Sequence, residues 1–213
     1  NVSKNNTKWT WSAEMKCIPD WKCISPKQIN IMISSKNNGF GNAIYLQIPR
    51  LKNPIPLFII FRAFNVISDK DICDKIILNI EDKKFKRMLY GLQGSIVDAN
   101  NCLTYDAAIR YITSNVIYTP LNVDKETGYK RKNEFAFEVI NNDIFPHCKS
   151  IEQKIYMLGY MTNRLLQTSF EWIEQSDRDS YLNKRIDLTG SLINNLLRNY
   201  LNKVVKDMQK QVV

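Results

Sequence analysis

The stretch from residue 176 to residue 190 holds the residue types that could do chemistry with a charged partner. It reads SDRDSYLNKRIDLTG, in which acidic and basic residues alternate without a regular apolar period. Arg178, Lys184 and Arg185 could present positive charge to a phosphate backbone. Asp179 and Asp187 could hold those cations in fixed directions. The same pattern also fits a solvated loop that is pinned by its own ion pairs, and spacing alone leaves both interpretations open.

Residues typical of catalytic sites are absent or badly placed. The single histidine, His147, directly precedes Cys148, so the two side chains cannot face each other within one element as a thiolate and imidazole pair must. Asp69, Asp71 and Asp74 stand near a predicted helix start, where the helix dipole explains them without a metal. Glycine spacing gives no phosphate-binding loop. We therefore predict no catalytic residue, no metal ligand and no cofactor in this chain.

The distribution of charge and the spacing of the cysteines limit the possible partners and the cellular compartment of the protein. Of the net charge of +9, residues 1–53 supply eight basic against two acidic residues, and residues 177–213 supply seven against four. Such clustering favours a polyanionic partner, although an anionic lipid surface is attracted by the same field. No apolar run approaches the roughly 20 residues of a membrane span, so no membrane partner is expected. Five scattered cysteines without a CxxC pair indicate a reducing, intracellular location.

The secondary-structure elements that are expected to position these residues change from strands to helices along the chain. β-type runs are expected at residues 13–18, 28–34 and 43–48, with a hairpin signal at Asn38-Gly39. Apolar spacing then becomes helical from Pro56 onward, and Ser68 and Thr104 look like starts of further short helices. The sequence thus predicts an α+β fold with N-terminal antiparallel strands followed by a mostly helical domain.

One short helix, two long helices and one loop are also predicted. Residues 81–90 form a short helix, and residues 151–172 form the strongest helix of the chain. Residues 191–213 form another helix, with an apolar stripe on one face and basic residues largely off it. Residues 123–132 show no periodicity and are predicted to be a loop, whose basic run could touch nucleic acid or simply be a solvated tip.

Four blocks of the sequence resemble one protein family in the same order. They are PIPLFIIFRAF at residues 54–64, FPH at 145–147, LGYMTNRLL at 158–166, and the segment 176–190 with its basic helix. The family is the second-largest subunit of multisubunit DNA-directed RNA polymerases, and the blocks are similar to its lobe domain in the eukaryotic, archaeal and large-DNA-virus branch. The chain departs from the family pattern at Ser176, Ser180 and Leu182, where an acid, a histidine and a glycine are usual.

The resemblance implies a place in a larger enzyme. Residues 1–175 would be the lobe and residues 176–213 the motif and helix leading into the fork region, all within a longer chain. The lobe would form one wall of the DNA cleft, contact downstream DNA and dock transcription factors beside the other polymerase subunits. Magnesium and the nucleotidyl-transfer chemistry would belong elsewhere in the enzyme, so the segment alone would be inactive.

Source and function class stay open at this point. The location would be the nucleus in a eukaryote, or the host cytoplasm or virion for a large DNA virus. The alternative is a free-standing basic nucleic-acid-binding module that shares only common helix patterns with the polymerase.

Overall fold

The computed structural model describes residues 1–5, 8–18, 26–79, 81–118, 124–184 and 186–212. The chain divides into two compact units, Asn1–Ser176 and Asp177–Val213, and each unit is described by itself.

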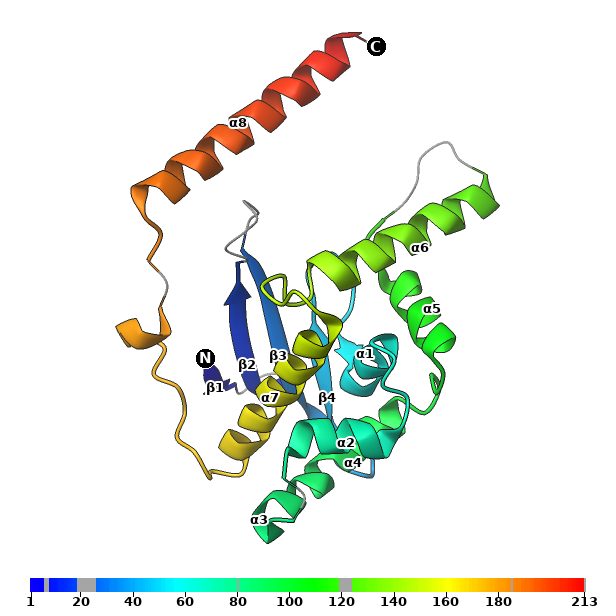
Figure 1. The fold of residues 1–213 in the computed structure, drawn as a ribbon, viewed down its shortest axis with the longest axis vertical. Helices are drawn as coiled ribbons and strands as arrows, with labels where there is room; N and C mark the ends of the chain where they lie inside the picture. Colours follow the sequence, from blue (N-terminus) through cyan, green and yellow to red (C-terminus); the bar gives the residue numbers. More distant parts are fainter. Residues whose placement is uncertain (6–7, 19–25, 80, 119–123, 185, 213) are drawn as a thin grey trace. The chain divides into compact units, whose positions relative to one another are not determined.

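The first unit begins with an antiparallel sheet whose strands follow one another in sequence order (Figure 1). The strands are β1 (Val2–Lys4), β2 (Trp9–Cys17), β3 (Lys27–Asn37), β4 (Asn42–Gln47) and β5 (Ile55–Pro56). Ile29, Ile31 and Ile33 alternate along β3 and are buried together, because every second side chain points to the same face. The predicted hairpin joins β3 to β4, where Gly39 and Gly41 both have positive φ.

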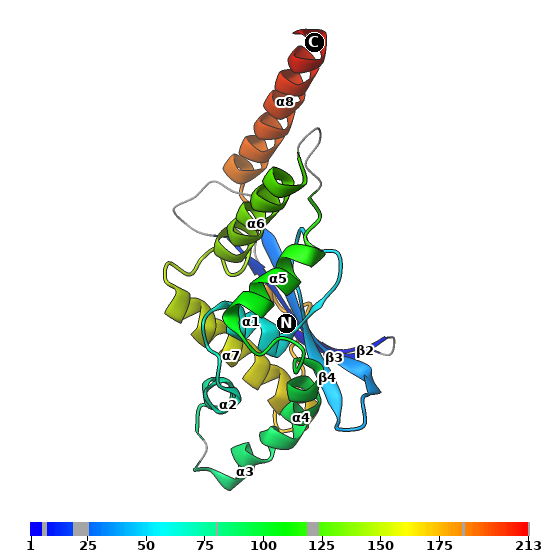
Figure 2. The ribbon, with the colours of Figure 1, turned by 90° about the vertical axis from the view of Figure 1, so that its right-hand side faces the viewer.

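Helices follow the sheet and cover one of its faces, as the side view in Figure 2 shows. They are α1 (Leu57–Ala63), α2 (Asp69–Ile77), α3 (Lys83–Lys86), α4 (Met88–Asp98), α5 (Tyr105–Asn115), α6 (Lys125–Asn142) and α7 (Ile151–Ser169). α1 and α4 pack on β4, and α7 crosses β1, β2 and β3. The predicted α+β class is confirmed, with one hydrophobic core between sheet and helices.

Local signals explain where several helices begin and which face they bury. Thr104 accepts a hydrogen bond on its side chain from the Ala107 N–H and so caps α5 as predicted. Ser150 and Gln153 form a reciprocal capping box at the start of α7. Leu158 and Leu165 of α7 are fully buried, so this helix presents an apolar face to the core.

The predicted loop at residues 123–132 is wrong from Lys125 onward, because α6 begins there. Gly128 is buried against the unit, while Lys130 pairs with Glu126 one turn earlier at 3.0 Å. The buried positions of α6 are few and lie far apart in the sequence. The many polar residues of its exposed face therefore hide the helical spacing of its apolar residues. Val123 lies outside the described residues.

Two smaller predictions also need correction. The single short helix expected at residues 81–90 is instead two helices, α3 and the longer α4, which continues to Asp98. Ser68 stands at the N-cap of α2 but makes no capping hydrogen bond with its side chain. The neighbouring Asp69 is drawn into an ion pair with Arg62.

Candidate nucleic-acid interface

The second unit begins with a turn that is closed by its own polar groups. Asp177 accepts a hydrogen bond at Oδ1 from the Asp179 N–H at 2.9 Å, which is a typical Asx turn. Asn183 donates from Nδ2 to the Asp177 carbonyl oxygen at 2.8 Å. These two bonds hold the backbone on both sides of Tyr181.

A single 3-10 turn, η1 (Tyr181–Asn183), follows, with Ser180 at its N-cap. The Ser180 Oγ accepts from the Leu182 N–H at 3.4 Å and so caps η1. Tyr181 and Leu182 project outward, at 80% and 96% exposure. Sequence reasoning missed this pair of outward apolar side chains, although their position among charged residues was a signal of an exposed site.

The predicted DNA-contacting cations are presented in different ways. Lys184 is held, because its Nζ lies 3.3 Å from Asp179 Oδ1 and 5.9 Å from the centre of the Tyr181 ring. Arg178 is exposed and has no ion-pair partner among the described residues of the chain. Arg185 lies outside the described residues.

The acidic residues predicted to orient the cations are both exposed. Asp179 faces Lys184 and not Arg178. Because the Asp179 side chain is 94% exposed, this ion pair is weak. Asp187 lies between η1 and the last helix. The turn can thus offer the positive charge of Lys184 to a polyanion at a small cost in free energy, because the ion pair between Lys184 and Asp179 is solvated and easily broken.

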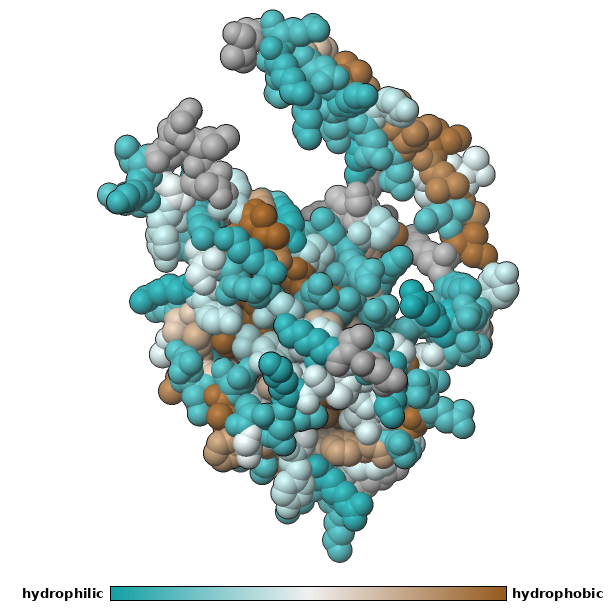
Figure 3. Space-filling model, turned by 180° about the vertical axis from the view of Figure 1, so that it is seen from behind, coloured by the Kyte–Doolittle hydropathy of each residue, from teal (hydrophilic) through white to brown (hydrophobic). Residues whose placement is uncertain are grey.

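The last helix, α8 (Thr189–Val212), confirms the prediction of a long amphipathic helix. Figure 3 shows hydrophobic residues along one side of it. The five stripe residues are each 52% to 61% exposed, namely Leu192, Leu196, Tyr200, Val204 and Met208. Its lysines Lys203, Lys206 and Lys210 are also exposed, and Arg198 is half-buried, so within the described part of this unit the apolar stripe is not covered.

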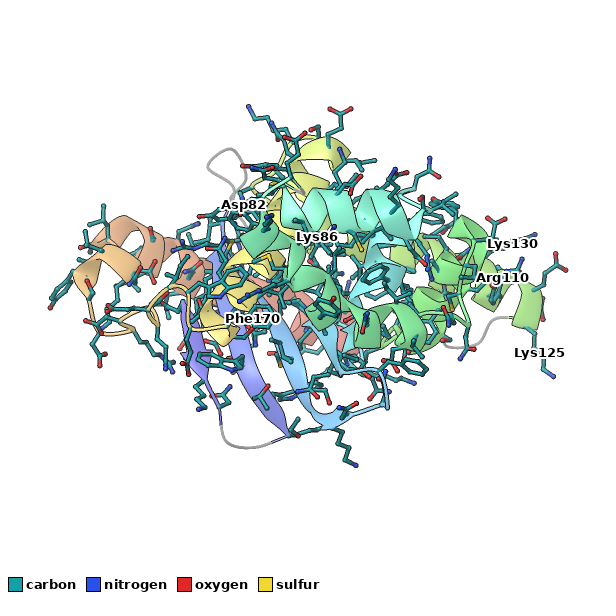
Figure 4. The ribbon with its side chains drawn as sticks, turned by 90° about the horizontal axis from the view of Figure 1, so that it is seen from below. Asp82, Lys86, Arg110, Lys125, Lys130 and Phe170 are labelled. Atoms are coloured by element: carbon teal, nitrogen blue, oxygen red, sulfur yellow. The ribbon has the colours of Figure 1, made fainter. Side chains whose placement is uncertain are left out.

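A second basic surface lies on the first unit, at the start of α6. Arg110 of α5 and Lys125 and Lys130 of α6 point outward from the same end of the unit (Figure 4). Because Lys130 is paired with the exposed Glu126, part of this charge is neutralised locally. This surface therefore has the mixed charge of a solvated helix end. The turn at residues 177–184 has this character to a smaller extent.

The pKa values of His147 and Cys148 shift away from those that a thiolate and imidazolium pair has. Burial lowers the pKa of the His147 imidazole, with a further contribution from the nearby Lys154. Burial raises the pKa of the Cys148 thiol. A thiolate and imidazolium pair needs the opposite shifts. The buried thiols are still less reactive, because burial raises the pKa of Cys17 to about 12 and that of Cys73 to about 11.

Side-chain clusters and helix lengths also bear on metal and membrane binding. Among the described residues, no group of three or more histidine, cysteine or acidic side chains is placed to hold a metal ion. In that part of the chain no helix is long and apolar enough to cross a bilayer.

Comparison with known families shows to which family the chain belongs. The family model described as RNA polymerase Rpb2, domain 2, matches residues 24–187. The chain belongs to this family. The Rpb2 domain 2 match starts just before β3 and ends just before α8, so it contains all five predicted site residues.

Relatives of this Rpb2 domain come from three kinds of organism. The DNA-directed RNA polymerase II subunit RPB2 of Schizosaccharomyces pombe is 31% identical over 193 residues, which are 89% of this chain and 15% of that protein. DNA-directed RNA polymerase subunit 2 of Acanthamoeba polyphaga mimivirus is 27% identical over 79% of this chain and 15% of its own length. DNA-directed RNA polymerase subunit Rpo2 of Saccharolobus solfataricus is 28% identical, over 79% and 14%.

These relatives confirm the resemblance to the lobe of the second-largest polymerase subunit in its eukaryotic, viral and archaeal branch. The chain spans only 14% to 15% of the length of these relatives.

Proposed function

We propose that the chain acts as the lobe of a DNA-directed RNA polymerase, where it forms one wall of the cleft, contacts downstream DNA and docks transcription factors. The observation that carries this proposal is the exposed, internally hydrogen-bonded turn at residues 177–184, which lies inside the Rpb2 domain 2 match. Its partners would be DNA, the other polymerase subunits and transcription factors, in the nucleus of a eukaryote or in the host cytoplasm or virion of a virus.

The turn suits a sequence-independent contact with phosphate. Arg178 and Lys184 are exposed cations on a short backbone loop, and Asp179 limits the directions that Lys184 explores. Contacts of this kind fix the register of a protein on DNA without reading bases. The family match favours the lobe over a free-standing module, because the turn is one part of a domain-length match.

Replacing Arg178 and Lys184 by alanine in the assembled polymerase should weaken binding of downstream duplex DNA for every sequence tested. The plot of log affinity against log salt should flatten by roughly one unit for each phosphate that the protein no longer neutralises. Fluorescence anisotropy of labelled duplex at several salt concentrations measures this slope. The domain should keep its melting temperature, because both side chains are exposed.

A matched control is the double variant Lys70→Ala/Lys75→Ala on α2, which removes the same amount of charge from two exposed residues. Its salt slope should equal that of the unmodified enzyme. If the Arg178/Lys184 variant keeps its slope but melts at a lower temperature, the turn is a structural ion-pair loop and the DNA contact is wrong.

We also propose that the domain supplies no group to nucleotidyl transfer and binds no cofactor. A two-metal site needs carboxylates clustered so that they hold two ions roughly 3.5 to 4 Å apart, and the sequence offers no such pattern. The 213-residue chain, given template, primer, nucleotides and magnesium, should therefore show no template-dependent incorporation on a sequencing gel. Extension that depends on this chain and follows the template would contradict the lobe assignment.

A further inference from the structure

Among the exposed aromatic side chains of the first unit, three come from segments that the fold packs together around α4. Phe40 is 62% exposed, Tyr90 is 71% exposed and Phe170 is 38% exposed. Single exposed apolar residues are normal, but several that gather in one place usually mark an interaction surface. These three come from the β3–β4 turn, from α4 and from the end of α7.

The fold brings the β3–β4 turn, which carries Phe40, against the part of α4 that carries Tyr90. Asn38 in the turn donates from Nδ2 to the carbonyl oxygen of Gly94 at 2.9 Å. A Cβ added to Gly94 would lie 2.8 Å from the carbonyl carbon of Gly41, so only glycine lets the turn rest on α4. Phe40 directly precedes Gly41, and Tyr90 stands one helical turn before Gly94.

Phe170 packs against α4 next to Tyr90, at the position of Gly91. A Cβ added to Gly91 would lie 3.2 Å from the Phe170 ring, which shows how closely the ring covers this helix position. Phe170 stacks on Trp172 with ring centres 5.2 Å apart, and Trp172 meets Phe85 of α3 edge-on at 6.2 Å. We name the surface formed by Phe40, Tyr90, Phe170, Trp172 and Phe85 the α4 aromatic patch.

Basic residues border the α4 aromatic patch. Figure 4 looks onto the end of the unit at which Lys86 and Phe170 lie. Exposed cations that lie within a few residues of the patch aromatics in the sequence are on α3, directly after α3 and in the last part of β3, namely Lys83, Lys86, Arg87 and Lys36. Glu81, Asp82 and Glu171 are interspersed with them. The border is therefore basic on balance but carries acidic residues between the cations.

We propose that the α4 aromatic patch docks a peptide segment of a protein partner, and that this segment carries an aromatic or aliphatic anchor next to acidic residues. The exposed rings supply the buried contact, and the lysines and arginine complement the acids. This inference rests on the docking part of the proposed function and gives it a place and a chemistry.

A peptide fits this surface better than a single-stranded nucleic acid does. Nucleic-acid platforms offer free ring faces beside a continuous basic groove. Here Phe170 is stacked on Trp172, and acidic residues interrupt the basic border. A peptide can direct its acids to the cations one by one, whereas a regular phosphate chain meets the interspersed carboxylates as well.

The test uses a library of short random peptides displayed on phage and the 213-residue chain as bait. Peptides that also bind the double variant Phe40→Ser/Tyr90→Ser are removed before sequencing. The remaining peptides should combine an aromatic or aliphatic residue with several Asp or Glu residues. A fluorescein-labelled copy of one of them should bind the unmodified chain at least about tenfold more tightly than the double variant in fluorescence anisotropy.

Two further variants separate this site from other surfaces. Lys83→Gln/Lys86→Gln should weaken the labelled peptide severalfold and make its binding less sensitive to salt. Tyr156→Ser/Tyr160→Ser removes another pair of exposed aromatics, 60% and 41% exposed and stacked on α7, and should change the affinity less than twofold. Circular dichroism checks that each variant is folded, and the lysine variant still tests the site if the Phe40 variant does not fold.

Several results would overturn the proposal. They are the absence of peptides that distinguish the double variant, survivors without an excess of acids, and an equal loss of affinity in the Tyr156/Tyr160 variant. Displacement of the labelled peptide by oligothymidylate would assign the surface to nucleic acid. None of these results bears on the salt slope of the Arg178/Lys184 variant, so failure of this inference and failure of the DNA contact can be told apart.

Discussion

Replacing Gly159 by alanine is expected to lower the free energy of unfolding by about 3 kcal/mol or more, at the upper end of the cost of overpacking. Gly159 lies where α7 crosses α2. An added Cβ would stand 2.3 Å from the carbonyl oxygen of Lys75 and 3.1 Å from its carbonyl carbon. Both atoms are backbone, so the helices must separate and loosen the 2.8 Å hydrogen bond from Asn163 Nδ2 to the Ile76 carbonyl.

The favourable part of this substitution is too small to compensate. Alanine is better than glycine inside a helix by about 1 kcal/mol. Gly190→Ala in α8 is the matched control, because nothing lies within 4 Å of its added Cβ. Urea unfolding followed by circular dichroism should show a large loss of stability for Gly159→Ala and little or none for Gly190→Ala. A loss below about 1 kcal/mol at Gly159 would mean that the helices can move apart at little cost.

The three longer strands, β2, β3 and β4, and most helix starts could be predicted from the sequence because their signals are local, whereas the short strands β1 and β5 were not predicted. Alternating isoleucines fix which face of β3 is buried, and Asn38-Gly39 fixes the hairpin that follows. Thr104 marks the start of α5 in the same local way. In each case the residues that carry the signal also make the decisive contact.

Helix α6 could not be predicted in this way, because its first half buries little. Gly128 is the buried position among residues 124–132, and a buried glycine looks like a loop residue when only the sequence is known. The i,i+4 pair of Glu126 and Lys130 was visible, but such a pair is worth only about 0.5 kcal/mol and cannot by itself specify a helix. Tertiary packing of Ala136 and Val139 anchors the rest of α6.

The candidate site was also predictable only where its signals are local in the sequence. The alternation of acids and bases predicted that an acid would hold a cation, and the pair of Asp179 and Lys184 has this form. The sequence did not indicate which cation would be held, because the Asx turn at Asp177 decides the direction of the side chains. The α4 aromatic patch was invisible, because its rings come from segments more than 100 residues apart, such as Phe40 and Phe170.

Replacing Arg62 by methionine is expected to lower the free energy of unfolding by about 3 to 5 kcal/mol, as loss of a buried charged partner does. Arg62 is only 1% exposed within α1. Its Nη1 donates to the carbonyl oxygens of Ala99 and Cys102 at 2.7 and 2.8 Å, and its Nη2 lies 2.5 Å from Asp69 Oδ1. Methionine fills similar space but donates nothing, so two carbonyls and a carboxylate lose their partner.

Two further substitutions identify which of these bonds matters. Arg62→Lys keeps the charge but cannot reach three acceptors with a planar fork, so its loss of stability should be intermediate. Asp69→Asn should cost less than Arg62→Met, because Asp69 is 39% exposed and water can solvate it, whereas the bonds from Arg62 to the Ala99 and Cys102 carbonyls are buried. Chemical unfolding of the three variants measures the order. Equal losses for Asp69→Asn and Arg62→Met would show that the ion pair, and not the two buried carbonyls, accounts for the role of Arg62 in joining α1 to the segment after α4.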